Sequence, residues 1–143
     1  MLISAILSNK GGQIISVTGD TIILDVTKVL RQHRIGAVLV KEPDGAIDGV
    51  LSERDIIRGL ATDGPAILER PAKTLMTREI ITCRPSDEVS AALAIMTKNR
   101  VRHLPVMDSG TLVGMISIGD LVNARIQESL MEAESLREYI ATG

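Results

Sequence analysis

Aromatic side chains are nearly absent from this chain of 143 residues, which contains no Trp, no Phe and a single Tyr, Tyr139. RNA-recognition and single-strand-binding surfaces stack bases on aromatic rings, so this composition argues against both. The net charge is −2, with 16 Lys and Arg against 18 Asp and Glu. No global positive field therefore draws the chain to nucleic acid or to an anionic membrane, and we expect neither as a partner.

Cysteine and histidine are also scarce. Cys83 is the only cysteine, which excludes an internal disulfide framework and a cysteine-rich zinc site. With only His33 and His103, a multi-histidine metal site is not expected either. We interpret His33 as a surface helix residue and Cys83 as a partly buried strand residue. The sequence has no nucleophile–base pair and no Gly-rich lysine loop, so we predict no enzyme, no catalytic residue and no metal.

Long hydrophobic runs are missing as well, and none reaches the roughly 18–20 residues that cross a bilayer. Residues 1–7 are apolar, but they are few and lack the basic region of a secretory signal. We expect them to form a short amphipathic helix that packs on the body of the protein. Together with the lone cysteine, these features predict a cytoplasmic protein. The 45% of hydrophobic residues is a globular composition, with a core of aliphatic side chains and Met.

The chain repeats itself, and the repeat covers polar as well as apolar positions. Residues 34–40 (Arg-Ile-Gly-Ala-Val-Leu-Val) align with residues 100–106 (Arg-Val-Arg-His-Leu-Pro-Val) at an offset of 66. Residues 49–55 then align with residues 114–120 at an offset of 65, with Gly, Ser and Asp identical in both. A period of this length indicates two copies of one supersecondary unit.

Each copy has the pattern β-α-β-β-α, which predicts an α+β fold. Apolar residues at helical spacing follow the first strand of each copy, and a second helix opens at Ser52 or Ser117. Ser86, with two acidic residues behind it, predicts the start of the first helix in the second copy. The expected strands are residues 14–17, 37–40 and 47–51, and then 80–83, 104–107 and 112–116.

The two copies are expected to pack on each other about a pseudo-two-fold axis, because a unit of about 60 residues buries little surface alone. Turn residues and helix breakers gather between Gly64 and Pro71, which indicates a linker. We therefore divide the chain into residues 1–66, the first repeat with the N-terminal helix, and residues 67–143, the second repeat with an extended C-terminal helix.

The most informative motif is Gly-h-h-Ser-x-x-Asp, where h is apolar, at residues 49–55 and again at 114–120. It places Ser at a strand-to-helix junction, where free N–H groups and the helix dipole favour phosphate. A carboxylate there can accept hydrogen bonds from vicinal hydroxyls, as in dinucleotide folds, and the glycine allows close approach to the backbone. The same pattern is also a capping box, explained by helix-start chemistry alone. Both interpretations can hold together.

The β-α-β-β-α unit, its duplication, the two aligned strands and the repeated motif resemble a pair of cystathionine-β-synthase-type (CBS) domains over roughly residues 10–125. The short chain looks like a stand-alone pair. The resemblance implies a Bateman module, in which clefts between two repeats bind adenosine-containing nucleotides and sense energy or redox state.

The resemblance assigns roles to the acidic and hydroxyl residues of the motif. Asp55 and Asp120 match the family's ribose-binding acid, and Ser52 and Ser117 match the hydroxyl that contacts ribose or phosphate. As an alternative, all four residues serve only to start helices.

The resemblance also implies cations that face phosphate. Arg54 matches such a position in the first copy, but Gly119 stands there in the second. Arg102 and His103, beside the matching strand, can compensate; the alternative is a solvated strand edge with a hydrogen-bonded histidine. The family's base-contacting positions, each equally well explained as core, correspond to Val17, Ile35, Gly36, Ala37, Thr82 and Val101.

The last helix is longer than the repeat requires. Apolar residues recur along it at steps of three and four; they are Val122, Ile126, Leu130, Ala133, Leu136 and Ile140. Twenty residues make about 30 Å of helix, longer than the small body beneath it. A second copy of the chain is the commonest partner for such a stripe; the alternative is packing on the chain's own N-terminal segment.

The sequence therefore predicts a non-catalytic regulatory module in signal transduction that binds AMP, ADP, ATP or NAD(H) as ligand, forms a homodimer and acts on an unknown downstream protein. No cofactor is expected, and the adenine nucleotide is a ligand only. The alternative is a structural dimerisation or protein-interaction module with empty clefts.

Overall fold

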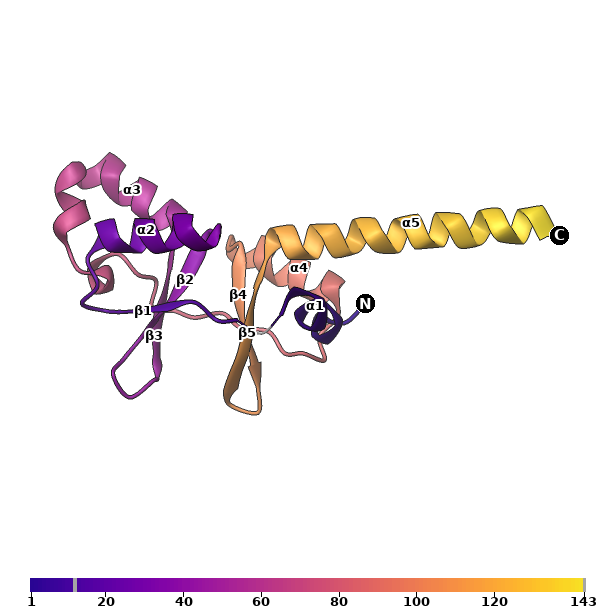
Figure 1. Cartoon of the computed structure of the whole chain (residues 1–143), viewed down its shortest axis with the longest axis horizontal. Helices are drawn as coiled ribbons and strands as arrows, with labels where there is room; N and C mark the ends of the chain where they lie inside the picture. Colours follow the sequence, from indigo (N-terminus) through magenta and orange to yellow (C-terminus); the bar gives the residue numbers. More distant parts are fainter. Residues whose placement is uncertain (12, 143) are drawn as a thin grey trace. The chain divides into compact units, whose positions relative to one another are not determined.

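The computed structural model describes residues 1–11 and 13–142, and the chain folds as two compact units (Figure 1). The first unit is Ile14–Ile80, and the second unit combines Met1–Gln13 with Ile81–Gly143. These units differ from the predicted division at residue 66. The N-terminal segment belongs with the second repeat, and the segment between the repeats belongs with the first.

The first unit follows the predicted β-α-β-β-α order. Its strands form a sheet in the order β1-β2-β3, with β1 parallel to β2 and β2 antiparallel to β3. The apolar residues of α2 recur at helical spacing and lie on one face of the helix. This face is buried against the sheet through Ile23, Val26 and Leu30. The elements are β1 (Ser16–Thr18), α2 (Ile23–His33), β2 (Ala37–Lys41), β3 (Ile47–Ser52), α3 (Glu53–Asp63) and the 3-10 helices η1 (Pro65–Glu69) and η2 (Ala72–Thr74).

The segment predicted as a linker is part of the core of the first unit. Ile67 and Ala72 are fully buried there. Further along, Thr77 pairs with Val50 of β3 through two backbone hydrogen bonds of 2.8 and 3.0 Å. The Gly and Pro residues of this segment break helices, but its apolar residues complete the sheet and helices that precede it.

The second unit has the same order of elements with one strand fewer. Strands β4 and β5 form an antiparallel pair. The strand predicted over residues 80–83 is reduced to a single parallel bridge, in which the Cys83 N–H and C=O bond to Pro105 and Met107. The elements are α1 (Ile3–Lys10), α4 (Val89–Asn99), β4 (His103–Asp108), β5 (Thr111–Ser117) and α5 (Ile118–Thr142). The predicted α+β class with two tandem repeats and a long last helix is confirmed.

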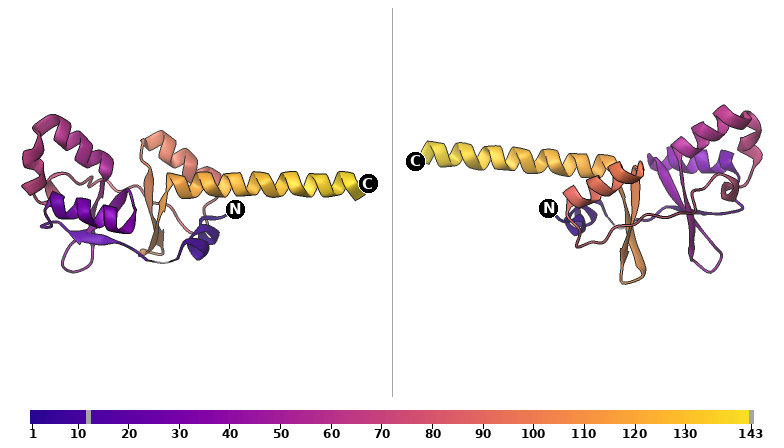
Figure 2. Two further views of the ribbon diagram at one scale, coloured as in Figure 1. Left: turned by 45° about the horizontal axis from the view of Figure 1, so that its top comes forward. Right: turned by 180° about the vertical axis from the view of Figure 1, so that it is seen from behind.

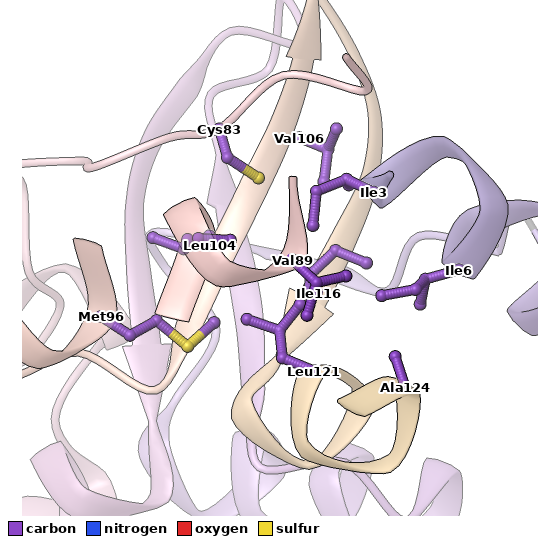
Figure 3. Packing of buried hydrophobic residues seen from close by; sticks show 11 residues of the cluster. Ile3, Ile6, Cys83, Val89, Met96, Leu104, Val106, Ile116, Leu121 and Ala124 are labelled. Carbon is purple, nitrogen blue, oxygen red and sulfur yellow. The ribbon is translucent and has the colours of Figure 1, made fainter. Parts of the chain in front are cut away.

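The predicted N-terminal helix is present as α1, and it packs on the second unit. Ile3 and Ile6 of α1 lie in one cluster with Met96, Leu104 and Ile116 (Figure 3). The chain before α1 also pairs with the chain before α4, since the Val89 N–H donates to the Met1 carbonyl at 3.0 Å.

Because of this pairing, α4 starts later in the chain than the sequence predicts. Glu88 is extended and bridges to Leu2, and the Asp87 carboxylate accepts the Arg84 N–H at 2.8 Å. Residues 84–88 therefore form a turn and an extended segment, and α4 begins at Val89. The prediction that Ser86 starts this helix is wrong.

The long helix α5 has 25 residues, or about 37 Å, and runs past the rest of its own unit (Figures 1 and 2). Only Leu121 and Ala124 are buried, and every residue from Ser129 to Thr142 is exposed, including Tyr139. The N-terminal amino group reaches α5 at Glu128, 2.7 Å away. The alternative in which the N-terminal segment covers the apolar stripe is therefore wrong for residues 129–142.

The glycine that opens the repeated motif makes room for a segment from outside its own repeat. A Cβ on Gly49 would lie 2.8 Å from the Thr77 carbonyl oxygen and from the Met76 sulfur. A Cβ on Gly114 would lie 2.6 Å from a methyl group of Leu7. The close approach expected at this glycine is thus made by the chain's own side chains and backbone.

We predict that Gly49→Ala lowers the free energy of unfolding by about 1–3 kcal/mol, because the contact includes a backbone carbonyl that cannot rotate away. Gly114→Ala should cost less, since a flexible Leu side chain can move. Urea denaturation monitored by circular dichroism measures both. Gly119→Ala is the matched control, because its nearest contact is 3.6 Å away. A Gly49 variant as stable as the control would contradict this account.

Candidate functional site

The two strand-to-helix junctions predicted as binding sites are built alike. Ser52 caps α3: its Oγ accepts the Asp55 N–H at 3.3 Å, and its N–H donates to Asp55 Oδ2 at 2.9 Å. Ser117 and Asp120 exchange the same two bonds at 3.1 and 2.9 Å. Both are capping boxes, so the helix-start interpretation is confirmed and uses one carboxylate oxygen of each Asp.

A second contact closes each junction against the strand in front of it. The first amide of α3, on Glu53, donates to the Gly36 carbonyl at 2.9 Å, and the first amide of α5, on Ile118, donates to the Arg102 carbonyl at 2.8 Å. The amide between the two bonded ones, on Arg54 or Gly119, has no protein acceptor among the residues described here. One N–H donor therefore remains at the positive end of each helix.

Asp55 is held mainly by its own cap. Its side chain is 12% exposed, and Oδ2 also accepts the Ser52 hydroxyl at 3.0 Å. The other oxygen, Oδ1, makes one long contact of 3.5 Å with Arg58, whose side chain is 72% exposed. An ion pair this exposed stabilises little, so Oδ1 is available to a hydrogen-bond donor.

Asp120 has a stronger partner that the sequence did not reveal. Lys10, the last residue of α1, places its ammonium 2.8 Å from Asp120 Oδ2 and 2.9 Å from the Met115 carbonyl. Burial acts to raise the pKa of Asp120, but the hydrogen bonds from Lys10 and Ser117 and the Lys10 charge outweigh it. The pKa of Asp120 is therefore lowered from its ordinary value of 3.8.

The structure brings most of the predicted site residues into two groups. In the first unit, Ala37 pairs with Ser52 across the sheet, so Gly36 and Ala37 adjoin the junction that carries Arg54. In the second unit, His103 pairs with Ser117. Arg102 and Arg54 are exposed and His103 is half-buried.

The predicted base-contacting residues are placed less uniformly. Val17 and Ala37 are buried, Val101 and Gly36 are half-buried, and Thr82 is exposed. Val17 belongs to the core of the first unit, which agrees with the alternative given for it above. Ile35 packs against that core and lines a groove of about 310 Å³ between α2 and α3.

The described residues offer no cluster of three or more His, Cys, Asp or Glu side chains that could hold a metal ion. Cys83 is 2% exposed, and burial, with a smaller effect of Asp87, raises the pKa of its thiol to about 11. The thiol is therefore protonated at neutral pH and a poor nucleophile. Among all the helices that the structure describes, none is both long enough and apolar enough to cross a membrane.

Comparison with known proteins identifies the repeat. The family model for the CBS domain matches residues 5–62 and 72–127. The mitochondrial CBS domain-containing protein CBSX3 of Arabidopsis thaliana is 35% identical over 99% of this chain and 72% of its own length.

Solved structures agree with this match. A CBS-domain-containing protein of Agrobacterium tumefaciens superposes with a TM-score of 0.85 and 36% identity, over 87% of this chain and 92% of that one. A CBS domain protein of Pyrobaculum aerophilum complexed with AMP gives a TM-score of 0.73 and 29% identity, over 84% and 89% of the two chains.

We predict that Asp120→Ala lowers the free energy of unfolding by about 1 kcal/mol at pH 7, and that this cost shrinks in acid. A carboxyl whose pKa is lowered by folding stabilises the protein above its unfolded pKa, here 3.8, and loses that effect as the pH falls through the folded value. Urea denaturation from pH 7 to below pH 4 measures the difference from wild type. Glu134→Ala, on the exposed part of α5, is the control. A cost for Asp120→Ala that does not change with pH would contradict the prediction.

Proposed function

Because the chain belongs to the CBS domain family and carries two copies of the domain, we propose that it is a regulatory module that binds an adenosine-containing nucleotide and catalyses no reaction. The observation that carries this proposal is the pair of half-buried carboxylates, Asp55 and Asp120, at the start of α3 and α5. Each keeps one oxygen in the capping box and offers the other to a ligand.

In the first unit, Asp55 Oδ1 accepts a hydrogen bond from a ribose hydroxyl, and Ser52 lies beside it. The amide of Arg54 points from the positive end of α3, and its guanidinium is exposed, so both are placed to bind phosphate. Hydrogen bonds to charged groups contribute about 1.5–3 kcal/mol each, which makes the carboxylate the main anchor of the sugar.

In the second unit, Asp120 takes the ribose and Ser117 lies beside it. The exposed Arg102 and the neighbouring His103 stand on the strand that pairs with Ser117, and we assign them to the phosphate side. We assign the adenine base to the predicted base-contacting residues, with Ile35 and Gly36 in one unit and Thr82 and Val101 in the other.

The chemistry of the junctions and one relative support the proposed ligand class. A sugar-binding acid next to an amide and an arginine suits AMP, ADP, ATP or NAD(H), and the Pyrobaculum protein is described as complexed with AMP. Binding any of these would let the module report energy or redox state to a downstream protein. The cytoplasmic location stays a prediction; the Arabidopsis relative is named as mitochondrial.

We predict that the full chain binds AMP and that Asp55→Asn and Asp120→Asn each remove one site. Asn keeps an amide oxygen for the capping N–H, but its NH₂ group cannot accept from ribose. Isothermal titration calorimetry with AMP, ADP, ATP and NADH measures affinity and stoichiometry. At 100 times the dissociation constant, the ligand should stabilise the fold by about 2.7 kcal/mol.

Asp63→Asn is the control for these variants, because Asp63 is paired with Arg70 on the surface at 3.0 Å and with no other charged group that the structure describes. It should bind like wild type. If no nucleotide binds or raises the melting temperature, the junctions are structural and the alternative, a protein-interaction module, is favoured instead.

We also propose that the module forms a homodimer through α5. The apolar stripe of α5 that begins at Val122 and ends at Ile140 contributes no hydrophobic stabilisation while it faces water. Pairing with the same stripe of a second copy would remove both stripes from solvent. Leu130, Leu136 and Ile140 are 59–68% exposed, so the stripe is uncovered within the described chain.

Replacing Leu130, Leu136 and Ile140 together with Gln should shift the protein from dimer to monomer in sedimentation velocity, while the circular dichroism melt of the two units persists. The matched control places Gln at Met131, Ser135 and Glu138, on the opposite face of the same helix. A wild-type chain that sediments as a monomer, or a control that dissociates equally, would contradict the assignment.

A further inference from the structure

The two junctions differ in where their positive charge comes from. In the first unit, α3 itself carries Arg54 and Arg58 around Asp55. At the repeat offset of 65, the corresponding residues of α5 are Gly119 and Asn123. The second junction therefore has a carboxylate, but no cation at the two helix positions that carry arginine in the first unit.

Lys10 supplies the missing charge from α1. Its ammonium bonds to the Asp120 carboxylate and also to the Met115 carbonyl, 105 residues away along the chain. The packing of α1 fixes this position, because Ile3 and Ile6 are buried in the core of the second unit and Leu7 fills the space over Gly114.

Lys10 does not block the oxygen that a sugar needs. It bonds to Oδ2 of Asp120, the oxygen that already accepts the Ser117 N–H in the capping box. The other oxygen, Oδ1, has no partner among the described residues and stays open to a ribose hydroxyl. An ammonium carries three N–H donors, and two are used here, so one remains for a ligand.

We propose that Lys10 is a ligand-binding residue of the second site, and that its charge makes this site select phosphorylated nucleosides over the free nucleoside. The inference rests on the nucleotide-binding function proposed above. A phosphate brought next to Asp120 meets like charge, and the Lys10 ammonium offsets that repulsion and donates to the phosphate. The second site thus includes α1, a segment that precedes both repeats.

The test uses the full chain with Asp55→Asn, so that only the second site is titrated. With Lys10 intact, this chain should bind AMP more tightly than adenosine. Adding Lys10→Met keeps most of the side-chain stem and removes the charge. The AMP affinity should then fall about tenfold, the effect of one lost charge-assisted bond, while the adenosine affinity stays within about twofold. Lys10→Arg keeps the charge and should retain the preference for AMP.

Lys73→Met is the matched control, since Lys73 also pairs with a single aspartate, Asp20, at 3.1 Å; it should change neither affinity. Equal loss of AMP and adenosine on Lys10→Met would show that Lys10 only positions Asp120 and would overturn the proposal. A gain in AMP affinity on Lys10→Met would show that Lys10 competes with the ligand for Asp120, and would also overturn the proposal. If the chain with intact Lys10 binds neither ligand, nucleotide binding at the second unit itself is refuted, and the role of Lys10 with it.

Discussion

The reciprocal bond pair between a serine and an aspartate at each strand-to-helix junction is the interaction on which the rest depends. It starts α3 and α5 at Ser52 and Ser117 and fixes the side chain of the aspartate three residues later. The same group therefore stabilises the helix with one oxygen and presents the other at the helix start. Folding chemistry and proposed ligand chemistry are compatible because a carboxylate has two oxygens.

Each repeat is completed by the segment that precedes the other repeat in the chain. The residues before the second repeat complete the first unit, through Ile67 and Thr77, and the N-terminal segment completes the second unit, through α1. The glycine of the repeated motif makes this possible in both units, because a side chain there would collide with the incoming segment. A motif that resembles a ligand contact in sequence is thus partly a packing requirement.

Local patterns predicted much of this structure. The duplication, the helix starts at Ser52 and Ser117, the order of elements and the long last helix follow from spacing and capping chemistry, which act over a few residues. The errors come from contacts between distant segments. The helix predicted to start at Ser86 begins later, because Glu88 pairs with Leu2 in an extended conformation. The ion pair of Lys10 with Asp120 joins residues that are 110 positions apart in the sequence. In the sequence, the only sign of Lys10 was the absence of a cation at Gly119.

The single aromatic residue of the chain lies on the exposed part of α5, where Tyr139 is 75% exposed. All intrinsic ultraviolet emission of the protein therefore originates from one ring outside both hydrophobic cores. Melting of either core leaves that ring in water, so emission intensity is a poor gauge of folding here. Contact of the α5 ends with another surface would change the solvent around this ring alone, which makes it a built-in optical probe of association.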